Sequence, residues 1–405
     1  MSERTAPFLA LDIGTAKTVA VVARRRPEGG VDVLHLVEVP TGMGLRHGMV
    51  VNIDATLAVV ARVAETLQEK IETNFSEVRA TISGAHLACL DNEGIVPVHG
   101  AEVSEQDVAR VLEAAKQLPL AEDRQLLHAL VQEFVLDDLG GIANPVGMSG
   151  RKLAVRVHVV TGLKSATHNL VKCIRRAGLN LTTLMVQGLA AAQAVLTEDE
   201  KALGVLLLDI GAGTTDMVVY AQGAVRYCTA LPLGGDRITH DIAMALRTPA
   251  ADAERLKCAY GAASYDWVAM DEFVDAPAIG DRPPRRLARQ RLVDVIHPRV
   301  EEIFEMALET LREQGLEEQI SAGVVLTGGS AKLSGISDLA EAVFGAPARV
   351  GIPYLSNEAE KWEDPAYAAV SGLLHAQWGD AAVWTKRRSG WFAQLLRWFF
   401  GTENR

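Results

Sequence analysis

Two aspartates in this chain each stand two positions before a glycine, at the end of an apolar run. The tetrapeptide Leu-Asp-Ile-Gly places Asp12 before Gly14, and it returns to place Asp209 before Gly211. Backbone N–H groups in a turn without bulky side chains can approach phosphate oxygens closely. A neighbouring carboxylate can hold Mg2+ through water, because this ion keeps much of its hydration shell. Two such turns facing each other would clamp the phosphates of a nucleotide and their metal.

Further small or polar residues lie near these turns. Thr214 and Thr215 add hydroxyl donors to the second turn, and Lys17 adds a positive charge to the first. The expected nucleotide-binding set is Gly14, Thr15, Lys17, Gly211, Gly213, Thr214, Thr215, Gly234, Gly235, Gly328, Gly329 and Ser330. The alternative is a pair of β-hairpins whose glycines only form turns. The second copy of the turn and the later glycine pairs favour the nucleotide site.

The elements around the two turns repeat as well. Residues 8–22 and 205–220 both follow the pattern of apolar strand, small-residue turn and apolar strand. A repeat separated by nearly half the chain predicts two related halves, since solenoid repeats are far shorter. Residues 84–163 differ: they contain short strand candidates (94–98, 130–136 and 153–160) and a helix capped by Ser104. This segment is predicted to be a compact insertion.

Composition limits the classes of protein that fit. The chain has 405 residues and a net charge of -11, which argues against a nucleic-acid binder because that function needs a basic face. The four cysteines have no paired spacing, so we expect neither disulfides nor a zinc site. We also expect no signal peptide and no membrane-spanning segment. The last twenty residues nevertheless carry a net charge of +4, from five basic residues and Glu403.

The order of the motifs resembles the superfamily of actin, heat-shock-chaperone and sugar-kinase ATPases. There the two turns and the strand that ends at Thr327-Gly328-Gly329-Ser330 are the phosphate-1, phosphate-2 and adenosine motifs. The resemblance implies ATP and Mg2+ as ligands, with Asp12 and Asp209 at the metal and two helices, near 187–196 and 366–374, between the halves. It also implies that Glu254 and Lys257 reach the ribose or adenine, although such helix residues usually form a solvated face. The residue that orients the attacking water falls at or near Gln187.

Several shorter segments are similar to the bacterial cell-division FtsA family. They lie at 48–54, 83–86, 144–150, 158–162, 196–200 and 298–302. The resemblance implies an α/β, actin-like two-lobed ATPase fold with duplicated ribonuclease-H-like subdomains. A small α+β insertion and a C-terminal amphipathic helix would be added to this fold.

The same resemblance implies a domain layout. Lobe I would comprise residues 1–83, 164–197 and 364–378, with the inserted subdomain at 84–163. Lobe II would comprise 198–239 and 306–363, with its own insertion at 240–305. A linker over 379–390 would lead to a membrane-targeting helix over 391–401.

Members of the family polymerise into filaments on the cytoplasmic face of the inner membrane at the division septum. They tether the FtsZ ring and recruit later divisome membrane proteins. The FtsZ C-terminal tail would dock near 240–305, where arginines can hold a carboxylate through two parallel hydrogen bonds. Arg286 and Arg299 are the candidates, and a solvated helix face is the alternative for either one.

Aromatic and basic residues gather at the end of the chain. The residues expected at an anionic membrane surface are Lys386, Arg387, Arg388, Trp391, Phe392, Leu395, Leu396, Trp398, Phe399 and Phe400. A short helix with a broad aromatic face and flanking cations lies in the plane of a bilayer. The alternative is a helix packed on its own domain.

For the nucleotide site we expect tight ATP binding with slow hydrolysis, and the nucleotide would act as a switch for assembly. Hydrolysis needs a group that orients water, and Gln187 departs from the small residue that the family often has there. An actin-like filament ATPase, a pilus-assembly adaptor and a small-molecule kinase remain as alternatives. The kinase lacks an evident catalytic base and gives the basic aromatic end no role.

Overall fold

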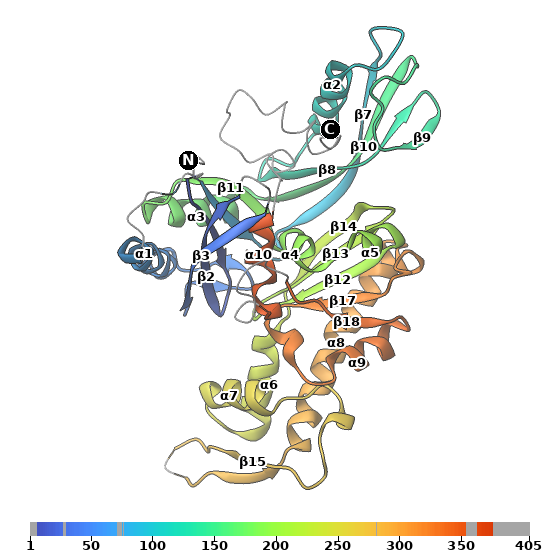
Figure 1. The fold of residues 1–405 in the computed structure, drawn as a ribbon. Helices are drawn as coiled ribbons and strands as arrows, with labels where there is room; N and C mark the ends of the chain where they lie inside the picture. The colour runs from blue at the N-terminus through green and yellow to red at the C-terminus, as the bar shows by residue number, and fades with distance from the viewer. Residues whose placement is uncertain are drawn as a thin grey trace.

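The computed structural model describes residues 6–26, 30–70, 75, 77–280, 282–353 and 363–375. Two five-stranded sheets form the centres of two lobes (Figure 1). The sheet of lobe I has the order β11-β6-β1-β2-β3. Its strands are β1 (Phe8–Ile13), β2 (Lys17–Arg25), β3 (Val31–Pro40), β6 (Val78–Ile82) and β11 (Leu181–Val186).

The sheet of lobe II repeats this arrangement. Its order is β14-β13-β12-β17-β18, from β12 (Val205–Ile210), β13 (Thr215–Ala221), β14 (Ala224–Leu231), β17 (Val324–Thr327) and β18 (Ala348–Val350). In both sheets the first strand pairs antiparallel with the second and parallel with a later strand. Both hairpins also have turns of the same length, since Ile13 is opposite Thr18 and Ile210 is opposite Thr215. The predicted duplication and the actin-like α/β fold are confirmed.

Two helices lie between the sheets. They are α4 (Gln187–Val195) and α10 (Ala368–His375), which follows a short turn at Pro365–Tyr367. The two helices cross so closely that a Cβ on Gly372 would overlap the carbonyl oxygen of Ala190. Gly372 therefore allows α10 to pack closely against α4 between the two lobes.

The inserted subdomain has a sheet and a core of its own. Its elements are β7 (Ala88–Pro97), α2 (Glu105–Lys116), β8 (Arg124–Leu136), β9 (Leu139–Ile142) and β10 (Lys152–Leu163), with the strand order β7-β10-β8-β9. Ser104 caps α2 and forms a reciprocal capping box with Asp107. The three strands expected here are present but longer than predicted, because they continue into the body of the molecule (Figure 1).

The remaining helices cover the two sheets and form the outer part of lobe II. They are α1 (Ile53–Lys70), α3 (Lys164–Arg176), α5 (Glu198–Leu203), α6 (Gly235–Leu246), α7 (Ala250–Tyr260), α8 (Gln290–Glu313) and α9 (Ile336–Phe344). A small hairpin, β15 (Phe273–Ala276) and β16 (Arg285–Ala288), lies at the far end of lobe II (Figure 1). Helix α8 begins at Gln290 and continues through Pro298. Leu292, Val293 and Ile296 are fully buried, so tertiary packing holds the helix across the proline.

No helix within the described ranges is long and apolar enough to cross a membrane. The linker over 379–390, the amphipathic helix expected over 391–401 and the basic residues Lys386, Arg387 and Arg388 lie outside the described residues.

An ion pair between buried His158 and exposed Asp91 makes the stability of the inserted subdomain depend on pH. His158 is 2% exposed, and its Nδ1 lies 2.7 Å from Asp91 Oδ1. Burial alone would lower the pKa of His158, but Asp91 and the neighbouring Cys89 together raise it from 6.5 to about 9. A raised histidine pKa stabilises the folded state below the ordinary pKa, and this contribution is lost as the pH rises through the folded value.

We therefore expect the inserted sheet to lose up to about 3 kcal/mol of opening free energy between pH 6.5 and 9. Hydrogen exchange of the β7 and β10 amides, corrected for intrinsic rates, measures this loss. His158→Gln should make the opening free energy lower at pH 6.5 and nearly constant across the window. An unchanged pH dependence in His158→Gln would contradict the assignment.

Candidate functional site

The two glycine turns of the repeat meet where the lobes face each other. Each turn is closed by the same backbone hydrogen bond, from Gly14 N–H to Lys17 O at 3.0 Å and from Gly211 N–H to Thr214 O at 2.9 Å. A Cβ on Gly213 would overlap the hydroxyl of Thr15, so the two turns are in direct contact. Glycine at this position therefore allows the close approach that a phosphate clamp requires.

Three carboxylates are buried behind these turns. Asp12 is 8% exposed, Asp209 is 3% exposed and Asp216 is fully buried. Burial raises the pKa of Asp12, against the opposing effects of Thr81 and Lys17. Burial also raises the pKa of Asp209 to about 7, against a hydrogen bond from Gln187 and with the help of the Asp12 charge. Like charges this close disfavour joint ionisation, and a cation between them would relieve the repulsion.

Asp216 is a buried acid that was not predicted from the sequence. It lies directly opposite Asp209 across the β12–β13 hairpin, whereas Val19 occupies the matching place opposite Asp12. Burial and the charge of Asp209 raise its pKa well above the ordinary value. Ser83 Oγ donates to both of its oxygens, at 2.9 and 2.7 Å. Aligning the two hairpins residue by residue would have found this extra acid.

Gln187 reaches the same place from the first turn of α4. Its Nε2 donates to Asp209 Oδ2 at 3.1 Å. On the other lobe, Thr81 Oγ1 donates to Asp12 Oδ1 at 2.5 Å. The structure thus brings the three residues predicted for catalysis and metal binding, Asp12, Asp209 and Gln187, to one site.

The residues predicted to contact the ribose or adenine, Glu254 and Lys257, lie together on α7, where Lys257 contacts α6. Lys257 Nζ donates to Gly235 O at 3.0 Å and to Thr239 Oγ1 at 2.8 Å, and it lies 2.7 Å from Glu254 Oε2. Ser330 Oγ donates to Gly211 O at 3.4 Å, which joins this group to the second turn. A Cβ on Gly328, whose φ is +86°, would overlap the Asp209 carboxylate. Gly234 packs on the carbonyls of the second turn in the same way, whereas Gly329 faces open space.

Three predicted phosphate ligands are engaged elsewhere in this structure. Lys17 Nζ forms an ion pair with Glu38 at 2.7 Å and lies 4.4 Å from the centre of the Tyr367 ring. Thr215 is fully buried, and its hydroxyl donates to Leu233 O at 2.9 Å. Thr214 is buried too, with its hydroxyl 3.4 Å from Asp216 Oδ2. Backbone N–H groups are therefore the main phosphate donors that the second turn presents.

A second residue that sequence reasoning missed is His47. It stands in the hairpin formed by β4 (Leu45–Arg46) and β5 (Met49–Val50), with a left-handed φ of +48°. Its Nδ1 donates to Gly213 O at 3.0 Å, and the next N–H, of Gly48, donates to Thr15 Oγ1 at 3.3 Å. This hairpin of lobe I therefore touches both turns. No local signal distinguishes His47, because the contact spans the two lobes.

The donor set fits a hydrated cation better than a fully protein-coordinated one. The described part of the chain contains no group of three or more histidine, cysteine or acidic side chains placed to hold a metal. Asp12 and Asp209 each stand two residues before the first glycine of a turn, and Mg2+ is commonly held by one or two carboxylates with water and phosphate. The residues present thus fit the predicted ion.

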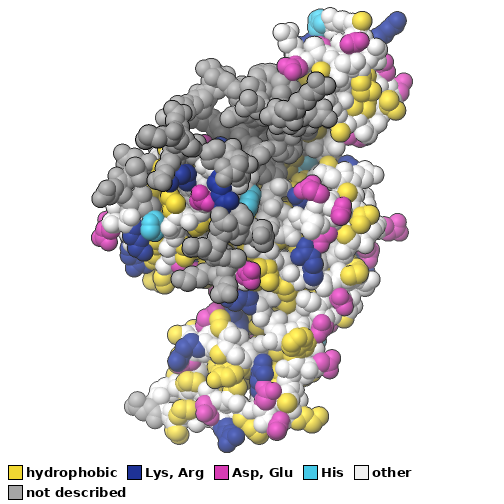
Figure 2. Space-filling view, in the orientation of Figure 1, with side chains coloured by type: hydrophobic (Ala, Val, Ile, Leu, Met, Phe, Trp, Pro, Cys, Tyr) yellow, Lys and Arg dark blue, Asp and Glu magenta, His cyan; other side chains and the backbone are white. Residues whose placement is uncertain are grey.

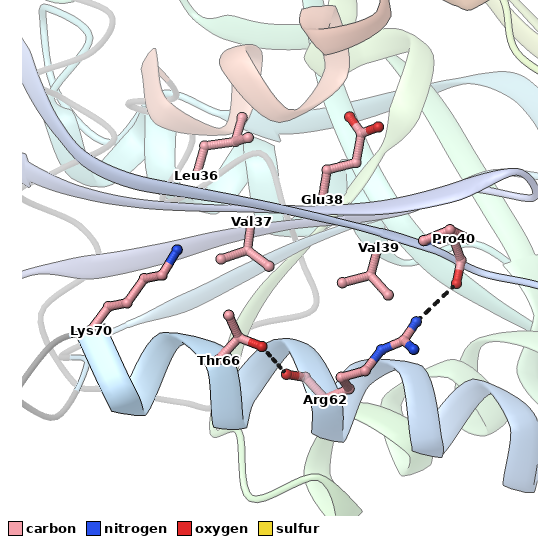
Figure 3. A pocket seen from close by; sticks show the side chains of 8 residues that line it. All are labelled: Leu36, Val37, Glu38, Val39, Pro40, Arg62, Thr66 and Lys70. Carbon is pink, nitrogen blue, oxygen red and sulfur yellow. Dashed lines mark hydrogen bonds between the residues drawn. The ribbon is translucent and has the colours of Figure 1, made fainter.

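A separate pocket of about 450 Å³ lies between β3 and α1 (Figure 3). It is lined by Leu36, Val37, Glu38, Val39, Pro40, Arg62, Thr66 and Lys70. None of the residues predicted for the nucleotide belongs to this lining, so the pocket is distinct from the junction of the turns.

Comparison with known proteins agrees with this geometry. Residues 206–372 match the family model "Cell division protein FtsA", and residues 84–161 match the model "SHS2 domain inserted in FTSA". The cell division protein FtsA of Pseudomonas aeruginosa is 41% identical over 368 residues, covering 91% of this chain and 88% of that protein. FtsA of Escherichia coli K12 is 37% identical over 373 residues, covering 90% and 89%.

Solved structures show the same fold at lower identity. The PilM-PilN type IV pilus biogenesis complex gives a TM-score of 0.61 at 22% identity, covering 91% of this chain and 97% of that one. MreB5 of Spiroplasma citri bound to ADP gives 0.56 at 15% identity, covering 91% and 95%. The duplicated lobes, the inserted sheet and these matches lead to one conclusion: the chain belongs to the FtsA family of cell-division proteins.

Proposed function

We propose that this chain binds ATP with Mg2+ between its lobes and, in that state, links the FtsZ ring to the cytoplasmic face of the inner membrane at the division septum. The observation that carries the nucleotide part is the contact of two equivalent glycine turns over the buried carboxylates Asp12 and Asp209. A neighbouring structure with this fold, MreB5, is described as bound to ADP. Filament formation and recruitment of later divisome membrane proteins follow from the family.

Different residues of the site would contact different parts of the nucleotide. Backbone N–H groups of both turns would hold the phosphates, and Lys257 and Glu254 would contact the ribose or adenine. Mg2+ supplies charge neutralisation between Asp12 and Asp209 when it is bound. Gln187 can orient a water molecule but its amide cannot accept a proton, and it already donates to Asp209. This arrangement favours retention of ATP over rapid hydrolysis, with the nucleotide serving as a switch.

Replacing Asp209 tests the clamp. Asp209→Ala removes one carboxylate of the metal site, so we expect Mg-ATP to bind about 10- to 100-fold more weakly, in line with the loss of a charge-assisted interaction. Competition with a fluorescent ATP analogue, with Mg2+ and with EDTA, measures this; the loss should appear only with Mg2+. Asp199→Ala, an exposed acid on α5, is the control. Unchanged Mg-ATP affinity in Asp209→Ala would disprove the clamp.

The far end of lobe II has the features of a docking surface for a short peptide. Trp267, Met270 and Phe273 are 54%, 87% and 51% exposed. The Arg286 guanidinium lies 4.7 Å from the centre of the Phe273 ring, beside this apolar surface. Figure 2 shows hydrophobic, basic and acidic side chains interspersed over this part of the molecule. An apolar surface next to an arginine suits the carboxylate-bearing tail of FtsZ.

The two predicted arginines differ in their surroundings. Arg299 is held by Asp241, with Nε 2.6 Å from Oδ2, and also by Glu302. These acids satisfy its guanidinium and raise its pKa further. We therefore favour Arg286 as the FtsZ contact and give Arg299 a structural role in joining α6 and α8.

Binding of a synthetic FtsZ C-terminal peptide distinguishes these roles. Arg286→Ala should weaken binding about tenfold, the expected loss for one charge-assisted pair. The control is Arg291, whose side chain is 70% exposed on the same part of lobe II. Arg291→Ala should bind the peptide as tightly as the unmodified protein. Fluorescence anisotropy measures both. Equal affinities for Arg286→Ala and Arg291→Ala would place the tail elsewhere.

Co-sedimentation tests the complete proposal. FtsZ should pellet with anionic liposomes only when this protein and ATP are present. Removal of residues 386–405 should abolish the effect, because the aromatic and basic end supplies the membrane contact. Recovery of FtsZ with liposomes in the truncated protein would contradict the anchor. A pilus-assembly adaptor or a filament ATPase that acts alone would leave FtsZ in the supernatant throughout.

A further inference from the structure

Strand β8 of the inserted subdomain runs into the body of the molecule and contacts both lobes. At its inner part, His128 Nε2 accepts a hydrogen bond from the Val186 N–H of lobe I at 3.0 Å. Four residues further along the strand, Gln132 Nε2 donates to Val225 O on β14 of lobe II at 3.2 Å. The same Gln132 group lies 3.3 Å from Asp91 Oδ1 of the insertion. A single strand thus joins the insertion to each lobe.

The contact with lobe I lies one residue from the candidate site. Val186 is the last residue of β11 and the N-cap of α4, and the side chain of Val186 makes no cap hydrogen bond. The first N–H groups of a helix lack intrahelical partners, so a helix start needs partners from outside. His128, fully buried, supplies one from another subdomain. The next residue, Gln187, reaches Asp209 with Nε2 at 3.1 Å.

A second connection starts where the chain enters the insertion. Ser83, immediately before the matched inserted domain, donates to Asp216 at 2.7 and 2.9 Å. Its hydroxyl also lies 3.3 Å from that of Thr214 in the second turn. The start of the insertion therefore contacts Asp216 directly through Ser83, and strand β8 contacts the residue next to Gln187, which donates to Asp209.

We infer that His128 is a positioning residue through which the inserted subdomain holds Gln187 against Asp209, so that the orientation of this subdomain and the nucleotide clamp are coupled. The inference rests on the proposed ATP binding for its effect on affinity. Its structural part, the hold of His128 on the start of α4, stands without a nucleotide. Because Gln132 ties the same strand to lobe II, closure of the lobes would be transmitted along β8 to the insertion.

A set of variants measured for Mg-ATP affinity at pH 7 tests this coupling. His128→Ala leaves the Val186 N–H without its buried partner, and affinity should fall about tenfold, as expected for one lost buried hydrogen bond. Gln187→Ala should show a similar loss, and the double variant should be no weaker than either single variant, because both act through one contact. His128→Gln, which can place an amide oxygen near the position of Nε2, should restore affinity to within about twofold.

The control is His158→Gln. It disturbs a buried histidine of the same inserted sheet, on β10, without touching α4. Its Mg-ATP affinity should match that of the unmodified protein. If His158→Gln reproduces the loss seen in His128→Ala, general destabilisation of the insertion is the cause and the inference is wrong. Multiplicative losses in the double variant would also overturn it.

Hydrogen exchange in the absence of nucleotide provides the second readout. The Val186 amide should exchange at least about tenfold faster in His128→Ala than in the unmodified protein, and at the normal rate in His128→Gln and His158→Gln. An unchanged rate in His128→Ala would overturn the inference whatever the affinities show. Failure of the unmodified protein to bind Mg-ATP would instead disprove the proposed function, while the exchange experiment would still decide the role of His128.

Discussion

Burial of three carboxylates where the lobes meet requires several elements of this fold to assemble around them. Asp12, Asp209 and Asp216 are each less than one-tenth exposed, and their mutual repulsion adds to the cost of removing them from water. Each one accepts a hydrogen bond from a different element: Thr81 on β6, Gln187 on α4 and Ser83 after β6. These donors can serve the acids only if both lobes, the central helix and the root of the insertion are assembled together. In the proposed function, a hydrated cation between Asp12 and Asp209 completes this balance of charge.

The duplicated hairpins share geometry but differ in chemistry. Both turns are closed by the same hydrogen bond, yet the partner opposite the first aspartate is Val19 and the partner opposite the second is Asp216. Lobe II therefore carries the extra acid, and it also carries the α6–α7 group around Lys257. Lobe I contributes the His47 hairpin, the insertion and half of the contact between the turns. The asymmetry suits a switch in which one lobe carries most of the nucleotide contacts and the other lobe responds to it.

Local patterns were sufficient to predict much of this arrangement. The repeated tetrapeptide with its flanking apolar runs located both hairpins, and Ser104 with its acidic first turn located the start of α2. His47 and His128 escaped prediction because their roles come from contacts between segments far apart in the chain, whereas Asp216 stands opposite Asp209 in one hairpin and an alignment of the two hairpins would have found it. Lys17 and Thr215 carry suitable groups, but Glu38 and the Leu233 carbonyl engage them here. Helix α8 continues through Pro298, a residue type that ordinarily interrupts a helix, because Ile296 and Val300 on either side of it are buried in the core of lobe II.

The two glycine turns, the inserted subdomain hydrogen-bonded to the start of α4 and the exposed apolar surface of lobe II are parts of one chain. We propose that Asp12 and Asp209 hold the metal of a bound ATP. A crystal structure with a non-hydrolysable ATP analogue and Mn2+ tests this most directly, because anomalous scattering locates the ion. We predict one strong anomalous peak between the two carboxylates, with the phosphates on the turns at Gly14 and Gly211. A triphosphate bound with its metal at neither aspartate, or in the pocket between β3 and α1, would contradict the account.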